Sequence, residues 1–144
     1  MSKLNNKVVL ITGGAGNIGS YILDKVLEQK PDKCIVVDNL FNSDKSYKKL
    51  NDNLVKFYPL DISKLDEMEY IFETYKPEYV FHCASMLIQD SEILPRKSIN
   101  TNIMGTFNIV DLSNKYNVKK ICYSSSASVY GEPQYLPVDE EHPF

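Results

Sequence analysis

A solid apolar run that leads directly into a glycine-rich turn constrains the fold of this chain more than any other feature. The run Val8-Val9-Leu10-Ile11 is followed by Thr12-Gly13-Gly14-Ala15-Gly16-Asn17-Ile18-Gly19, and Ile22 and Val26 continue from Ile18 at helical spacing. Such a run is typical of a parallel strand that is buried on both faces, and the later spacing predicts an amphipathic helix. The segment therefore predicts a strand, a tight turn and a helix in direct succession.

The same alternation of short apolar runs and longer amphipathic segments continues along the chain. Further strands are expected at Cys34–Val37, Leu54–Tyr58, Tyr79–His82 and Val118–Ser124. Strands that alternate with helices predict a parallel sheet with right-handed crossovers. The expected fold class is therefore α/β, a Rossmann-type doubly wound parallel sheet with the strand order 3-2-1-4-5.

Two further helices are expected from capping signals and apolar spacing. The first follows Ser63, which has Asp66 three residues later as in a capping box, and it carries the apolar stripe Leu65, Met68 and Phe72. The second runs from Pro95 to about Tyr116 and is marked by the apolar stripe Ile99, Ile103, Phe107 and Val110.

Length and composition exclude several classes of protein. With 144 residues, 43% of them apolar and 24% charged, the chain has the size and composition of one soluble globular domain. A net charge of −3 without a strongly basic face argues against nucleic acid as a partner. The longest apolar stretches are too short for a membrane span, and the polar N-terminus does not resemble an export signal.

The three cysteines, Cys34, Cys83 and Cys122, are far apart in the sequence and lack metal-site spacing. Each lies in an apolar, strand-like run, so buried reduced thiols are expected, together with a cytoplasmic location and no metal site.

The glycine turn has the spacing and the context of a dinucleotide-binding turn. Gly13, Gly16 and Gly19 let the backbone approach phosphate groups closely, and the following helix offers free N–H groups to them. Asp38 ends the second expected strand, where a carboxylate accepts the adenosine ribose hydroxyls and repels the extra phosphate of NADP. These features favour NAD as the cofactor; the alternative is an ordinary tight turn with an unrelated capping Asp.

At this point the sequence resembles the extended short-chain dehydrogenases, and among them the NAD-dependent epimerase/dehydratase family. Six motifs occur in the family's order along nearly the whole chain: Thr12 to Gly19, Val37-Asp38-Asn39-Leu40, Asp61-Ile62, Phe81-His82-Cys83-Ala84, Asn102-Ile103-Met104-Gly105-Thr106 and Ser124 to Gly131. The combination is far more specific than any one of these motifs.

The resemblance implies a set of cofactor-binding residues. In chain order they are Gly13, Gly16, Asn17, Ile18, Gly19, Asp38, Asn39, Asp61, Ile62, Cys83, Ala84, Ser85, Asn102 and Ser124. The family's counterparts of Asp61 and Ile62 contact adenine, although Asp61 as a helix-capping residue is an alternative. Small residues after His82 let the backbone pass beneath the cofactor, and His82 itself is expected to be a packed structural histidine. The family's counterpart of Asn102 anchors the active-site region by hydrogen bonds.

Ser126 is the catalytic candidate that the resemblance implies. In the family's epimerases, the last serine of the Ser-Ser-Ser-Ala-x-Val-Tyr-Gly motif donates a hydrogen bond to the reacting sugar hydroxyl; the alternative is polar filler at a strand end. Dehydratases of the family place Asp-Glu directly after this position, whereas this chain has Ala127 and Ser128. Epimerisation is therefore expected rather than dehydration.

The family's general base, a tyrosine with a lysine four residues later, is expected to follow beyond Phe144. The internal matches Tyr21/Lys25 and Tyr116/Lys120 have the spacing, but they lie on the turn-bearing helix and after the long helix, away from the expected sugar site. Tyr130 has Gln134 at the fourth position. Residues 1–144 are thus expected to form an incomplete NAD-binding domain without its substrate region.

Together these features predict the NAD-binding portion of a nucleotide-sugar epimerase, which by itself is catalytically incomplete. The intact enzyme is expected to use a nucleotide sugar, a UDP-sugar above all, and to form a homodimer. The absent helix should leave an apolar patch beside the long helix, and such patches favour self-association. A non-catalytic NAD-binding or structural fragment remains an alternative, as does a reductase or decarboxylase of the same family.

Overall fold

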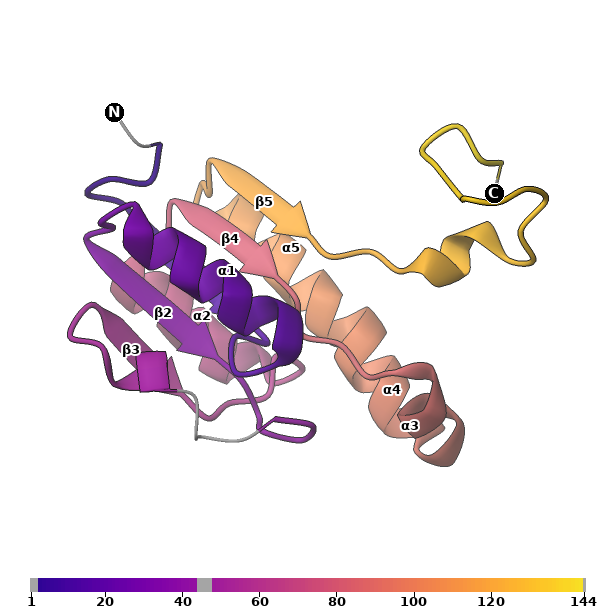
Figure 1. Ribbon diagram of the computed structural model, residues 1–144. Coiled ribbons are helices and arrows are strands. Elements are labelled where there is room, and N and C mark those ends of the chain that lie inside the picture. Colours follow the sequence, from indigo (N-terminus) through magenta and orange to yellow (C-terminus); the bar gives the residue numbers. More distant parts are fainter. Residues whose placement is uncertain (1–2, 44–47, 144) are drawn as a thin grey trace.

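A parallel sheet forms the centre of the molecule (Figure 1). The computed structural model describes residues 3–43 and 48–143. The sheet has the order β3-β2-β1-β4-β5, and its strands are β1 (Val8–Thr12), β2 (Lys33–Val37), β3 (Val55–Tyr58), β4 (Tyr79–His82) and β5 (Lys120–Tyr123). All neighbouring strands pair in parallel, so the expected doubly wound order is confirmed.

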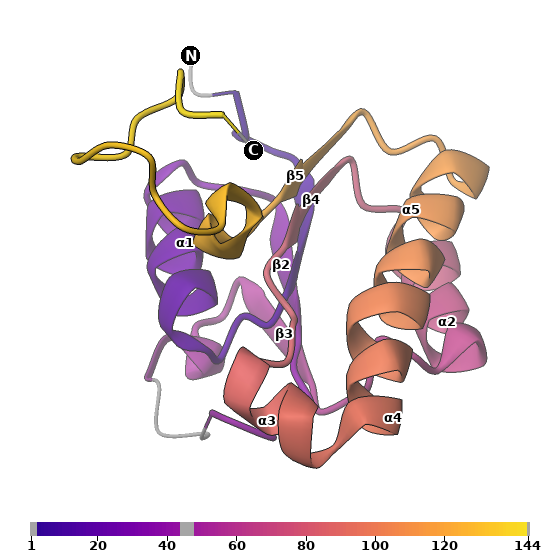
Figure 2. The ribbon, with the colours of Figure 1, turned by 90° about the vertical axis from the view of Figure 1, so that its right-hand side faces the viewer.

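Helices cover both faces of the sheet, as the turned view shows (Figure 2). Helix α1 (Asn17–Glu28) lies on one face, and helices α2 (Leu65–Tyr75) and α5 (Thr106–Lys115) lie on the other. Successive strand residues point to opposite faces, so Leu10 and Ile35 pack towards α2 and α5, whereas Ile11 and Val36 pack towards α1. The middle strands are buried on both sides, which explains their continuous apolar runs.

The connection from β4 to β5 differs from a single regular helix. After a short helix α3 (Ile88–Ile93), which the sequence pattern did not predict, the chain forms α4 (Pro95–Ser98), the π-helical segment η2 (Ile99–Gly105) and then α5. Two short 3-10 turns, η1 (Lys48–Asn51) and η3 (Ala127–Tyr130), lie elsewhere in the chain. The predicted helix from Pro95 onwards is confirmed, but its middle is π-helical.

The apolar stripe that marks this long helix in the sequence lies on its solvent side. Ile99, Ile103, Phe107 and Val110 each have 50–61% of their surface exposed. The side facing the protein carries small or polar residues in η2, where a Cβ on Gly105 would lie 2.6 Å from the side chain of Ile62. The long helix therefore presents an apolar surface to solvent.

Several local predictions were wrong. Lys64, not Ser63, is the N-cap of α2, and Leu65, the first residue of the helix, is 44% exposed, whereas Met68, Ile71 and Phe72 are buried. Ser63 instead donates its backbone N–H to Asp61, 2.9 Å away. Ile18 of the α1 stripe is also exposed.

Of the three thiols that were expected to be buried, only one is. Cys34 is buried, Cys83 is half-buried and Cys122 is exposed, and all three are free. Cys122 is exposed because β5 is an outer strand and α1 does not extend over its face (Figure 1). None of the helices in the described residues has the length and apolar content that crossing a bilayer requires.

Candidate functional site

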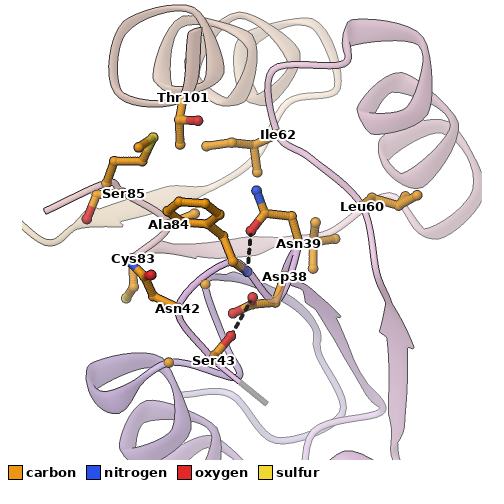
Figure 3. A pocket seen from close by; sticks show the side chains of 15 residues that line it. Asp38, Asn39, Asn42, Ser43, Leu60, Ile62, Cys83, Ala84, Ser85 and Thr101 are labelled. Carbon is orange, nitrogen blue, oxygen red and sulfur yellow. Dashed lines mark hydrogen bonds between the residues drawn. The ribbon is translucent and has the colours of Figure 1, made fainter. Parts of the chain in front are cut away.

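A pocket opens at the carboxyl ends of β1, β2 and β4, where the strand order reverses (Figure 3). Ligands of open α/β sheets bind at such a switch point. The pocket has a volume of about 100 Å³. Its lining residues are Gly13, Gly16, Val37, Asp38, Asn39, Phe41, Asn42, Ser43, Leu60, Ile62, Cys83, Ala84, Ser85, Met86 and Thr101.

The glycine turn allows the chain to pass very close to the segment after β4. Gly13 has φ +69°, and a Cβ on it would lie 2.6 Å from the backbone nitrogen of Ala84. A Cβ on Gly19 would lie 2.1 Å from the carbonyl oxygen of Gly13. Real Cβ contacts are not this short, so the turn and the first helical turn of α1 can pack together only with glycine at these positions.

The amino end of α1 presents backbone N–H groups at the turn. The N–H of Ser20 donates to the carbonyl of Gly16 at 3.0 Å and closes the first helical bond. The N–H groups of Asn17, Ile18 and Gly19 precede that bond, and the N-cap Gly16 has no side chain to accept from them. This arrangement combines free donors with the positive end of the helix dipole, which suits a phosphate group.

Asp38 joins the turn to the loop after β2. Its Oδ2 accepts the N–H of Ala15 at 3.0 Å, and its Oδ1 accepts the N–H of Leu40 and the hydroxyl of Ser43, each at 2.8 Å. Asp38 as a residue is only 8% exposed, and a carboxylate has about four acceptor positions. Asp38 therefore keeps limited capacity for a further donor, such as a ribose hydroxyl, at the pocket wall.

Asp61 lies after β3 and is held in its ionised form. Burial opposes ionisation, but hydrogen bonds from Ser63 and Asn39 and the charge of Lys97 outweigh it and lower the pKa of Asp61. Asn39 Nδ2 donates to Asp61 Oδ2 at 3.3 Å. Ile62 lines the pocket, whereas Asp61 lies just outside its lining.

His82 is buried between the glycine turn and the long helix. Its Nδ1 lies 2.6 Å from Thr12 Oγ1, and its Nε2 lies 2.9 Å from Thr106 Oγ1. Burial lowers the pKa of His82 to about 4, so the ring is neutral near pH 7. The expected packed histidine is confirmed, and it also connects three elements, which the sequence pattern did not indicate.

Asn102, in the middle of η2, holds the segment that leaves β4. Its Oδ1 accepts the N–H of Met86 at 2.7 Å, and its Nδ2 donates to the carbonyl of Met86 at 3.1 Å. Cys83, Ala84 and Ser85 of this segment line the pocket, while Asn102 does not. Asn102 thus supports the pocket wall, and its contact with a cofactor stays a prediction.

The serine motif lies outside the pocket lining. Ser124 donates its N–H to the carbonyl of His82 at 3.0 Å, next to the end of β4. Ser126 is exposed, and its Oγ accepts the N–H of Ser128 at 3.2 Å, which caps η3. The chain beyond β5 extends away from the sheet in Figure 1. The catalytic role of Ser126 remains a prediction.

The internal Tyr/Lys pairs are placed away from the pocket. Tyr21 is 71% exposed on α1, and Lys25 forms an ion pair with Glu28. Tyr116 is the C-cap of α5 and donates to Glu69 at 3.3 Å, and Lys120 is the first residue of β5, at the opposite end of the strands from the pocket. Among the described residues, no group of three or more His, Cys, Asp or Glu side chains is arranged to hold a metal ion.

Seven lining residues were not among the predicted site residues: Val37, Phe41, Asn42, Ser43, Leu60, Met86 and Thr101. Their proximity to Asp38, Asp61 and Cys83 in the sequence was a usable signal for all but Thr101. Thr101 is 5% exposed inside η2, where α-helical spacing does not apply.

The sheet order, the glycine turn and the acid after β2 together define a Rossmann-type nucleotide-binding domain. Residues 9–144 match the model of the NAD dependent epimerase/dehydratase family, and the chain belongs to that family.

Similar proteins include several epimerases. The chain is 36% identical to UDP-glucose 4-epimerase from Dictyostelium discoideum, with 94% of this chain and 40% of the relative covered. It is 38% identical to the Drosophila melanogaster enzyme of the same name, with coverages of 94% and 41%. The chain therefore spans about two fifths of the length of these relatives.

Solved structures that resemble this chain also include epimerases, and the chain again covers about two fifths of each. The UDP-glucose 4-epimerase of Thermotoga maritima with UDP-glucose matches with a TM-score of 0.79 and 38% identity, covering 87% of this chain and 40% of that chain. The UDP-glucose 4-epimerase of Bifidobacterium longum in complex with NAD+ and UDP matches with a TM-score of 0.83 and 34% identity, covering 94% and 42%.

Proposed function

We propose that this chain is the NAD-binding portion of a nucleotide-sugar epimerase that acts on a UDP-sugar. The observation that carries the proposal is the amino end of α1 behind the glycine turn, where the N–H groups of Asn17, Ile18 and Gly19 precede the first helical hydrogen bond and suit a phosphate group. The similar epimerase from Bifidobacterium longum was crystallised with NAD+ and UDP. When bound, NAD supplies a reversible hydride acceptor, so that a sugar carbon can pass through a ketone and change its configuration.

Each part of the pocket has a distinct proposed task. The N–H groups of Asn17, Ile18 and Gly19 bind the pyrophosphate, with Gly13 and Gly16 giving it access. Asp38 accepts an adenosine ribose hydroxyl at its remaining acceptor position and disfavours NADP. Asn39, Asp61 and Ile62 form the adenine side, and Cys83, Ala84 and Ser85 lie beneath the cofactor with Asn102 and Ser124 supporting them.

The binding step is tested by thermal unfolding with and without the cofactor. A ligand at 100 times its Kd stabilises the folded state by about 2.7 kcal/mol, which is a clear rise of the unfolding midpoint. We expect this rise with NAD and a much smaller one with NADP at the same concentration. An unchanged midpoint with NAD would favour the alternative function, a structural fragment that binds no cofactor.

Catalysis by residues 1–144 alone is not expected. Ser126 would orient the reacting sugar hydroxyl, but a general base contributes about 10²–10⁴ in rate, and the Tyr/Lys pairs within the chain lie away from the pocket. A coupled assay for epimerisation of UDP-glucose, with NAD present, should show no turnover. Ordinary turnover would refute this assignment of the catalytic groups.

Self-association through the long helix is part of the proposal. Ile99, Ile103, Met104, Phe107 and Val110 are all at least 46% exposed and follow one another along η2 and α5. Apolar patches of this kind mark protein interfaces, and we propose a homodimer in the cytoplasm, where free thiols persist. Light scattering should show a dimer that I103D shifts to the monomer, whereas the I93D control on α3 leaves it dimeric.

A further inference from the structure

The loop after β2 reaches across the pocket to the helices that follow β4. Asn42 Nδ2 donates to Asp90 Oδ2 of α3 at 2.6 Å. Lys97 Nζ of α4 lies 3.5 Å from the centre of the Phe41 ring. Phe41 and Asn42 line the pocket, whereas Asp90 and Lys97 do not. Phe41 and Asn42 of the loop are therefore held by two residues outside the pocket lining.

The base of the same loop is fastened to the pocket floor. Asp38 accepts the backbone N–H of Leu40 and the hydroxyl of Ser43, and the Asp38 and Ser43 side chains are visible together in Figure 3. Leu40 has φ +59°, a backbone conformation that costs energy for a residue with a side chain. Phe41 N–H donates to Asn39 Oδ1 at 3.1 Å. The loop thus holds a strained shape between two anchors.

The contacts of Asn42 and Phe41 are of different kinds, and their partners belong to the neighbouring helices α3 and α4. The Asn42–Asp90 bond is a hydrogen bond to a half-buried carboxylate, and the Phe41–Lys97 contact places a cation over an aromatic face. Lys97 also acts on the other side of the loop, because its charge favours the ionised form of Asp61, to which Asn39 donates.

We propose that Asp90 and Lys97 are positioning residues that hold loop 39–43 in its binding shape at the adenosine end of the cofactor, and so slow cofactor release. The proposal rests on the NAD binding proposed above. A loop that is already ordered loses less conformational freedom when the ligand binds, so the complex is tighter and dissociates more slowly. Without these contacts, the strained backbone at Leu40 has no support from the far wall.

The loop itself is tested first without any ligand. Hydrogen exchange measured by mass spectrometry on a peptide covering residues 38–43 should be faster in D90A and in K97M than in the unaltered chain. The matched controls are E92A and R96M, which remove the same charges from exposed positions on the same two helices. D90N keeps a carbonyl oxygen as acceptor for Asn42, so it should restore slow exchange. Equal exchange in variants and controls would overturn the proposal.

Cofactor release is then measured with NAD, ADP-ribose and nicotinamide mononucleotide as probes. K97M should raise the dissociation rate of NAD and ADP-ribose about twofold to fivefold, as expected from an exposed cation–π contact. D90A should raise it about twofold to tenfold. Nicotinamide mononucleotide, which lacks the adenosine half, should be unaffected, and unfolding midpoints should match those of the controls.

The outcomes separate the two proposals. If the unaltered chain binds NAD but D90A and K97M release it as slowly as E92A and R96M, the positioning role is wrong and NAD binding stands. If the unaltered chain binds neither NAD nor ADP-ribose, both proposals are wrong. Tighter binding in D90A or K97M would also overturn the positioning role, because the contacts would then hold the loop in a shape that opposes the cofactor.

Discussion

Replacement of Gly19 by alanine sets two effects of opposite sign against each other. Gly19 is the third residue of α1, and alanine is favoured over glycine in a helix by about 1 kcal/mol. Against this, the new Cβ would lie 2.1 Å from the Gly13 oxygen and 2.7 Å from the Gly14 Cα. Overpacking costs about 1–3 kcal/mol, and the upper part of that range applies because both neighbours are backbone atoms that cannot rotate away.

We therefore expect G19A to lower the free energy of unfolding by about 1–2 kcal/mol, measured by urea denaturation. NAD affinity should fall more strongly, since the turn must open to admit the methyl group. The matched variant for the stability measurement is G16A in the same turn. There the Cβ would meet only the Gly13 oxygen, at 3.3 Å, and the φ of −78° suits alanine. A G19A protein as stable as wild type, with unchanged NAD affinity, would refute the reasoning.

Three further predictions concern His82, the thiols and Asp38. The pKa of His82 is about 4 when folded and about 6.5 when unfolded, so the unfolded chain binds more protons between these values. Unfolding free energy should fall by up to about 3 kcal/mol as the pH drops from 6.5 to 4, and H82Q should flatten this slope in urea titrations at several pH values. Cys122 should react with a thiol reagent faster than Cys83, because burial raises the pKa of Cys83; NAD should slow the labelling of Cys83 only, as mass spectrometry of the labelled peptides would show. D38N should narrow the preference for NAD over NADP in the thermal assay while keeping an acceptor for Leu40; an unchanged preference would argue against Asp38 as the discriminating group.

The features that followed from the sequence are those set by local patterns. The strands and the glycine turn were predicted from apolar runs and glycine spacing, and the strand order from the doubly wound fold class that this alternation indicates. Asp38 was placed correctly because the end of a buried strand fixes its position in the sheet. The carboxyl ends of parallel strands lie at one edge, so the first residues after each strand had to meet there.

The features that could not be predicted depend on contacts between distant segments. The π-helical stretch breaks the 3.6-residue period, so Thr101 faces the pocket and the stripe containing Ile103 faces solvent. The contact between Phe41 and Lys97 joins residues 56 positions apart, with no pattern in either segment to indicate it. Asp66 has the right spacing to cap the N–H of Ser63, but in the structure this N–H donates to Asp61 instead.

Strand β5, at one edge of the sheet, has a practical consequence for handling the protein. Within the described residues β5 pairs only with β4, and Lys120, Cys122 and Tyr123 along it are exposed. An open strand edge of this kind is a template for pairing with another chain, unless charge or a covering segment blocks it. Lys120 is the one charged residue on this strand. At high concentration we expect intermolecular strand addition at this edge, with Cys122 in position for oxidative crosslinking between molecules, so a reducing agent belongs in every preparation.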